Sequence, residues 1–357
     1  MNDALPSKEV FTHRQYAHCE SGVSSNLIQH AGPPVSEAMA FGIGSGIFFA
    51  HMPFVKIMGL PLTSYRSLPT TIFKKCCKRL DLDYKHKKFS SSEKGQNFLD
   101  ELLSKKKIVA LQTNIFWLPY MPERFRFPFN AHNIIVFNKT STGDYEVSDP
   151  VLESTALCPT EDMNKARFAK GPLSPKGFLY YIDTNNTVIS DDQFRKGIYA
   201  GLKESCHRML YTPLPFFGLK AIPYLSKQIK KWHLKNSAKR FTLMLTHVVR
   251  MQEEIGTGGA GFRFLFARFL EEASKYFPES KEGETLSSAS KEFLLIGDLW
   301  RQWASTAVKA CKNKSSIAEE DIDRLDTLLH EIFSREQAAF KNIHLKFVLS
   351  AKKNFSL

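Results

Sequence analysis

The chain has 357 residues, of which 43% are hydrophobic and 24% charged, the composition of an ordinary globular protein. Its length suggests two domains, and no stretch approaches the ~18 uninterrupted apolar residues of a membrane helix. Forty-nine Lys and Arg against 36 Asp and Glu give a net charge of +13. This charge suits an acidic partner, whereas the basic runs lack the interleaved aromatic residues of a nucleic-acid-binding motif.

The N-terminus and the cysteines indicate the cellular compartment of the protein. Residues 1–16 show no basic region followed by an apolar one, so no secretory signal is predicted. The six cysteines are scattered, without metal or disulfide spacing, and this predicts reduced thiols, no metal site and a cytoplasmic protein. They are Cys19, Cys76, Cys77, Cys158, Cys206 and Cys311.

The first half of the chain combines short helices with strands. Residues 1–18 are expected to form an arm leading into a helix over 20–30, which Gly32-Pro33-Pro34 ends. The alternating glycines of 41–49 do not follow the nucleotide-binding order and predict backbone packed closely against another element, such as helix 20–30. Further helices are expected over 69–80 and 91–105.

A strand-rich region follows, and then helices only. Strands are predicted over 108–113, 133–138, 145–149 and 177–183, with a turn at 139–144. Helical periodicity predicts helices over 191–210, 219–232, 238–254, 262–277, 286–311 and 318–340. The charged stretch 278–284 is expected to be a loop, and the tail from Ser350 is expected to fray. We therefore predict an α+β catalytic domain over 1–185 and an all-helical domain over 186–357 that covers the site and shapes the substrate pocket.

Cys19 stands just before the predicted helix 20–30. A thiol at a helix N-terminus faces unpaired N–H groups and the positive end of the helix dipole, and both favour the reactive thiolate. Taken alone, a buried structural cysteine would explain this residue as well.

Two further residues change that balance. His132 precedes the outgoing strand of the predicted hairpin and Asp149 ends the returning one, so both emerge at the same end. Nucleophilic catalysis needs a thiolate, an imidazole that exchanges protons with it and a group that orients the imidazole. We predict that Cys19, His132 and Asp149 supply these, in the order and helix-then-sheet arrangement of papain-like enzymes.

Several short motifs resemble the N-terminal domain of the butirosin biosynthesis protein H family. They are 18–22 (HCESG), 30–32 (HAG), 41–44 (FGIG), 118–120 (LPY), 132–136 (HNIIV) and 147–150 (VSDP). The C-terminal half resembles the helical domain of unknown function that often follows it. The matching residues are 218–221 (GLKA) with Trp232, 256–263 (GTGGAGFR) and 269–273 (FLEEA).

The family is grouped with papain-like and C39-like thiol enzymes, and its namesake moves an acyl group from an acyl carrier protein thioester to an aminoglycoside amine. The resemblance implies that Cys19 attacks a thioester and that His132 manages the protons. It implies no bound cofactor, but a phosphopantetheine-linked donor on an acidic acyl carrier protein or on CoA. The acceptor, a small molecule or a lipid, takes the acyl group through an amine or hydroxyl.

Other readings remain open on the same residues. The triad could instead serve a cysteine hydrolase (a peptidase, amidase or thioesterase), or the chain could be an idle scaffold that binds a carrier protein. The sequence does not determine the acyl group, the acceptor or the oligomeric state, and a homo-oligomer is one of the alternatives.

Further site candidates follow from the papain-like pattern and from local sequence. The backbone N–H of Cys19 and the side chain of Gln15 are candidate oxyanion donors. Asn114 either lines the site or caps a loop, and Tyr120 is a substrate-binding candidate. Gly258 and Gly259, with Arg263 close by, either cradle an anion or form a turn for close helix packing.

Overall fold

The computed structural model describes residues 11–57, 59–184, 187–312 and 318–351. The chain divides into a first unit, residues 1–40 with 81–189, and a second unit, residues 41–80 with 190–357. The predicted boundary at 185/186, the first ten residues of the predicted arm and the end of the predicted frayed tail lie outside the described residues. Residues 41–80, which fall within the predicted first domain, group by their contacts with the helical unit.

The first unit combines helices with an antiparallel sheet. Its helices are α1 (Cys19–His30), the start of α2 (Glu37–Ile43), α4 (Ser92–Ser104) and α5 (Thr160–Arg167), with 3₁₀ turns at η1 (Ile115–Trp117) and η2 (Glu123–Phe125). Its strands are β3 (Tyr84–Lys87), β4 (Val109–Thr113), β5 (His132–Lys139), β6 (Tyr145–Ser148), β7 (Ala156–Cys158) and β8 (Leu179–Ile182).

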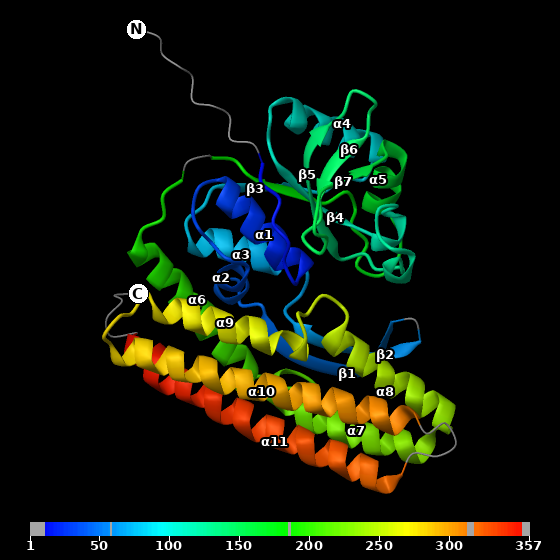
Figure 1. Cartoon of the computed structure of the whole chain (residues 1–357), viewed down its shortest axis with the longest axis vertical. Helices are drawn as coiled ribbons and strands as arrows, with labels where there is room; N and C mark the ends of the chain where they lie inside the picture. The colour runs from blue at the N-terminus through cyan, green and yellow to red at the C-terminus, as the bar shows by residue number, and fades with distance from the viewer. Residues whose placement is uncertain (1–10, 58, 185–186, 313–317, 352–357) are drawn as a thin grey trace. The chain divides into compact units, whose positions relative to one another are not determined.

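Within the described residues these six strands form one sheet in the order β3-β8-β4-β5-β6-β7, with every pair antiparallel. β4 is buried along its whole length, as its run Val-Ala-Leu-Gln-Thr predicts for a central strand. Leu99, Leu102 and Leu103 of α4 join apolar residues of β4, β5 and β6 in one buried cluster. This core includes residues of β5, which begins with His132, and of β6, which leads to Asp149; Figure 1 shows the two strands side by side.

Helix α1 packs on β5 of the same sheet. His18 is its N-cap, and the imidazole accepts a hydrogen bond from the backbone N–H of Ser21. Gly22 allows the helix to approach the chain after β6, because a Cβ here would lie 2.8 Å from both Pro150 Cβ and Tyr16 Cβ. The nucleophile candidate therefore begins a helix that is pressed against the segment carrying Asp149.

The second unit begins with a hairpin and continues in helices. Strands β1 (Ile47–Ile57) and β2 (Leu60–Arg66) pair antiparallel, with register shifts in β1. The helices are α3 (Thr71–Arg79), α6 (Asp191–Leu210), α7 (Ala221–Lys235), α8 (Ala238–Glu253), α9 (Arg263–Ser274), α10 (Lys281–Lys312), α11 (Glu319–Ile343) and α12 (Leu349–Ala351). The 3₁₀ turns η3 (Gly218–Lys220) and η4 (Ala260–Phe262) precede α7 and α9, and the π-helical segment η5 (His344–Val348) follows α11.

Helix α10 is the centre of this unit and packs against α8, α9 and α11 (Figure 1). The hairpin belongs here because β1 contacts α7 and β2 contacts α8. The glycine-rich stretch 41–49 packs closely, as predicted, against α6 and α9 of its own unit. A Cβ on Gly42 would overlap the Phe269 ring, and a Cβ on Gly201 would lie 2.5 Å from the Gly42 carbonyl oxygen.

All six cysteines are free thiols. Among the residues that the structure describes, no helix has the length and apolar character needed to cross a bilayer.

Candidate active site

His132 and Asp149 meet at the open end of the β5–β6 hairpin. Ser148 pairs with Ile135, which places Asp149 opposite Ile134, two residues from His132. The imidazole Nε2–H of His132 donates a 2.6 Å hydrogen bond to Asp149 Oδ2. Oδ2 also accepts from the Tyr120 hydroxyl at 3.3 Å, and Oδ1 accepts from the Val151 N–H at 3.2 Å. The carboxylate is thus held on both oxygens, and it fixes the ring orientation of His132.

The Asp149 carboxylate is the main group that favours the protonated form of His132. Burial by itself disfavours the charged imidazole, but the charge and hydrogen bond of Asp149 outweigh it. With a smaller contribution from Cys19, they raise the pKa of His132 to about 10. The site therefore favours an imidazolium beside Cys19, the state that can later return a proton to a leaving group.

Cys19 is the first residue of α1 and is 7% exposed. Its Sγ lies 3.9 Å from the carbonyl oxygen of Ala131 and 4.0 Å from Nδ2 of Asn133. Because Nε2 of His132 is engaged by Asp149, the nitrogen left to exchange a proton with Cys19 is Nδ1. The structure thus brings together the three residues that the sequence predicts for a nucleophile, a base and an orienting group.

A buried carboxylate holds the backbone just before Cys19. Glu37 Oε1 accepts hydrogen bonds from the His18 N–H at 2.8 Å and from the Ser21 hydroxyl at 3.1 Å, and Oε2 accepts from the Ala17 N–H at 3.1 Å. Burial raises the pKa of Glu37, although these three bonds favour the carboxylate. Glu37 therefore positions the turn into α1 without touching Cys19 in any contact described.

The arm before Cys19 is tied to the loop after Asp149. The Tyr16 N–H donates to the Pro150 carbonyl at 2.6 Å, and His13 bonds to the Ser148 hydroxyl at 2.7 Å and the Leu152 carbonyl at 3.1 Å. These hydrogen bonds join residues more than a hundred positions apart in sequence. They fix the position of helix α1 relative to the β5–β6 hairpin.

The oxyanion candidates differ in their surroundings. The backbone N–H of Cys19 belongs to the first turn of α1, where amides have no partner within the helix. Gln15 is an exposed residue of the arm. The structure therefore places Gln15 at the surface, while another side-chain amide, that of Asn133, is buried beside Cys19.

Asn114 makes the bonds of a loop cap. Its Oδ1 accepts from the Phe116 N–H at 2.9 Å and its Nδ2 donates to Asn130 Oδ1 at 2.7 Å. These contacts agree with the interpretation that Asn114 caps a loop. The hydroxyl of Tyr120, a substrate-binding candidate, donates to Asp149 and supports the carboxylate.

The glycine-rich turn before α9 is filled by the protein's own groups. The Ala260 N–H donates to the Glu253 carboxylate, and a Cβ on Gly259 would lie 2.7 Å from Arg301. Arg263 is fully buried and forms a bidentate pair with Glu336 at 2.8 and 3.0 Å. The Arg263 side chain and the Ala260 N–H are thus engaged by carboxylates of the chain, which favours the interpretation of this stretch, including Gly258, as a turn for close helix packing.

Sequence reasoning missed Glu37 and Asn133. Neither lies in a motif that marks chemistry, and a buried acid or amide shows its partners only in the folded chain. The one local signal is the position of Asn133 directly after His132, at the start of a strand.

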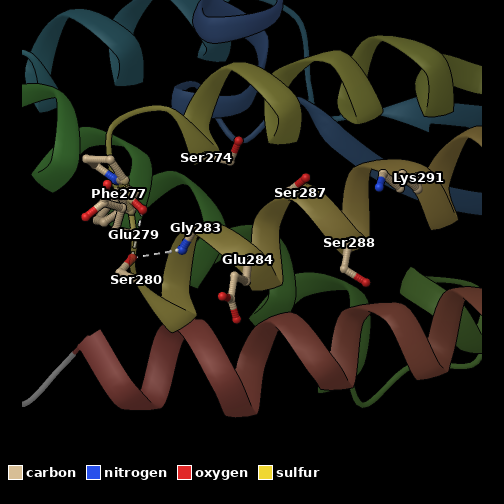
Figure 2. Close-up of a pocket in the computed structure, with 10 residues that line it drawn as sticks. Ser274, Phe277, Glu279, Ser280, Gly283, Glu284, Ser287, Ser288 and Lys291 are labelled. Carbon is tan, nitrogen blue, oxygen red and sulfur yellow. Dashed lines mark hydrogen bonds between the residues drawn. The ribbon is translucent and has the colours of Figure 1, made fainter.

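A shallow pocket of about 400 Å³ lies in the second unit, where α9 ends and α10 begins (Figure 2). Its polar lining includes Ser274, Ser287, Ser288 and Lys291, and Ser280 Oγ accepts from the Gly283 N–H at 3.1 Å. The lining contains no histidine or cysteine, so this pocket lacks the chemistry assembled around Cys19.

Two family models match consecutive parts of the chain, and the first of them includes residues 41–80, which pack with the second unit. Residues 18–150 match the family model "Butirosin biosynthesis protein H, N-terminal", and residues 161–343 match "Domain of unknown function (DUF4872)". The chain belongs to the family that combines these two domains. No curated protein matches the chain significantly.

Proposed function

We propose that this protein is a cysteine-dependent acyltransferase of a biosynthetic pathway. It takes an acyl group from a carrier-protein or CoA thioester, holds it on Cys19 and passes it to an amine or hydroxyl. The observation that carries the proposal is the buried His132–Asp149 pair beside a cysteine at a helix N-terminus. The match to a family named for a biosynthesis protein supports the pathway assignment.

The arrangement also supports a papain-like assignment for the first unit. A helix that begins at the nucleophile packs on a sheet whose neighbouring strands carry the base and its orienting carboxylate. This division of the three roles between one helix and one hairpin is the arrangement that papain-like enzymes use.

The reaction proceeds in two steps without a redox change. The Cys19 thiolate bonds to the thioester carbonyl carbon, and the carbonyl electron pair moves to oxygen. The pair returns, the bond to the donor sulfur breaks, and imidazolium His132 protonates that departing thiolate. In the second step His132 removes a proton from the acceptor amine or hydroxyl, which attacks the acyl carbon and releases Cys19.

The donor accounts for the charge of the chain. Acyl carrier proteins are acidic, and a protein of net charge +13 attracts them over the range of a Debye length. The phosphopantetheine arm arrives with the donor as substrate, so the site requires no resident cofactor. Free thiols at all six cysteines suit the reducing cytoplasm where such donors are made.

A hydrolase would use the same three residues, and the acceptor distinguishes the two. We expect acyl-CoA or acyl-carrier-protein thioesters to release free thiol slowly in buffer and several-fold faster when primary amines are added, with an acylated amine as product. Cys19→Ala abolishes the release, while Cys158→Ala, which alters a buried cysteine of the same unit, retains it. Fast thiol release that no amine or alcohol changes, with only free acid formed, would identify a hydrolase instead.

A further inference from the structure

The amide of Asn133 lies between the nucleophile and the backbone of its own strand. Asn133 follows His132 in β5 and is fully buried. Its Nδ2 lies 3.1 Å from the Ala131 carbonyl oxygen and 4.0 Å from Cys19 Sγ. Amide, thiol and carbonyl thus form a compact triangle, since Sγ is itself 3.9 Å from the same carbonyl oxygen.

The orientation of this amide is determined by its neighbours. The Ala131 carbonyl can only accept a hydrogen bond, so the NH₂ group of Asn133 must face it. The Oδ1 atom then faces the other way, where the buried Tyr180 hydroxyl donates to it at 3.0 Å. An amide nitrogen carries two hydrogens, and with one committed to Ala131 the other is directed to the side of Cys19.

A thiolate that attacks a thioester creates a charged oxygen on the carbon bonded to Sγ. That oxygen needs preorganised donors, and the Cys19 backbone N–H is one. We propose that Asn133, rather than the exposed Gln15, is the catalytic residue that supplies the second donor. This inference rests on the proposed acyl chemistry at Cys19.

The proposal predicts a specific kinetic signature. The second donor stabilises a charge that exists only while the thioester carbonyl is under attack. Its loss should therefore lower the rate constant of Cys19 acylation with little change in the thioester concentration for half-maximal rate. Alkylation of Cys19 by iodoacetamide displaces iodide from a CH₂ group and places no charge on a carbonyl oxygen, so it should change little.

The experiment uses the full chain and the CoA thioester that acylates the wild type fastest. Asn133→Ala and Asn133→Leu, which has a similar shape and adds no charge, are compared with Asn138→Ala, a matched change at an exposed position of β5. Intact-mass kinetics follow acylation and iodoacetamide alkylation in parallel. We expect acylation to fall about 10²- to 10³-fold in both Asn133 variants, alkylation to stay within about threefold, and Asn138→Ala to match the wild type.

Other outcomes overturn the inference in distinguishable ways. Equal losses of acylation and alkylation would show that Asn133 only shapes the site. If Asn133→Ala does not fold, the result with Asn133→Leu is the one that decides. Unchanged acylation in the Asn133 variants, with a large loss in Gln15→Ala, would return the role to Gln15. A wild type that is alkylated at Cys19 but acylated by no thioester would remove the proposed function and this inference with it.

Discussion

His132 Nε2 and Asp149 Oδ2 lie 2.6 Å apart although 17 positions separate the two residues in sequence. Both side chains are almost completely buried, so the pair replaces the water that would otherwise solvate an imidazolium. The geometry makes Asp149 an orienting and charge-stabilising group, and it leaves the other nitrogen of His132 for Cys19.

This pair predicts a pH-dependent contribution to stability. The pKa of His132 is raised in the fold to about 10, from 6.5 for an unperturbed group. The native state therefore binds the proton more tightly, and the stabilisation is fully present below about pH 6.5 and is lost as the pH rises through about 10. Urea unfolding should show the excess stability of wild type over Asp149→Asn shrinking across that range. An excess that does not vary with pH would contradict the assignment.

Gly22 is predicted to set the distance between the nucleophile helix and the segment after Asp149. A side chain at this position meets Pro150 and Tyr16 at 2.8 Å, so one of the elements must shift. We expect Gly22→Ala, and more strongly Gly22→Val, to cost about 1–3 kcal/mol of unfolding free energy and to slow acylation of Cys19 in the same order. Thermal denaturation and acylation kinetics measure both effects. Two variants that behave as wild type would show that the contact is not constraining.

The Arg263–Glu336 pair is predicted to be a structural element of the second unit. Both side chains are fully buried, and the Trp300 indole N–H also donates to Glu336 at 2.7 Å. Arg263→Met or Glu336→Leu alone should destabilise the unit by about 3–5 kcal/mol, because each leaves an unpaired buried charge, and the double variant should recover part of the loss.

The matched control for that pair is Arg268→Ala. Arg268 is 57% exposed and pairs with Glu272 on the surface of α9, so its loss should cost about 1 kcal/mol or less. Denaturant unfolding of the four variants provides the comparison. A single substitution of Arg263 that costs no more than Arg268→Ala would show that the buried pair does not hold the unit together.

Elements with explicit local signals were predictable from sequence. Helix α6 has the predicted bounds 191–210, since Ser190 and Gln193 form a capping box at its start. The β1–β2 hairpin was missed because Pro53 interrupts an apolar run and the register shifts, so the strand has no regular alternation. Its pairing is a tertiary property, which periodicity does not record.

The contacts of the candidate site also differ in how far the sequence predicts them. The contact of His132 with Asp149 follows from a single hairpin, so the sequence suffices to predict it. The contact of Cys19 with Asn133 spans 114 positions and depends on how α1 packs on β5. The glycine-rich turn shows the opposite. Its composition is typical of an anion-binding loop, but in the folded chain the carboxylate of Glu253 accepts the hydrogen bond of this turn.

If Cys19 carries the acyl group, mixing the protein with acyl-CoA and acyl-carrier-protein thioesters should give a mass gain of one acyl group in intact-mass spectrometry. Peptide mapping should locate this gain at Cys19. The gain should be absent from Cys19→Ala and present in Cys158→Ala. An adduct that persists in Cys19→Ala would show that Cys19 does not carry the acyl group. A wild type that no thioester acylates while it cleaves peptides or amides would be a hydrolase and not an acyltransferase.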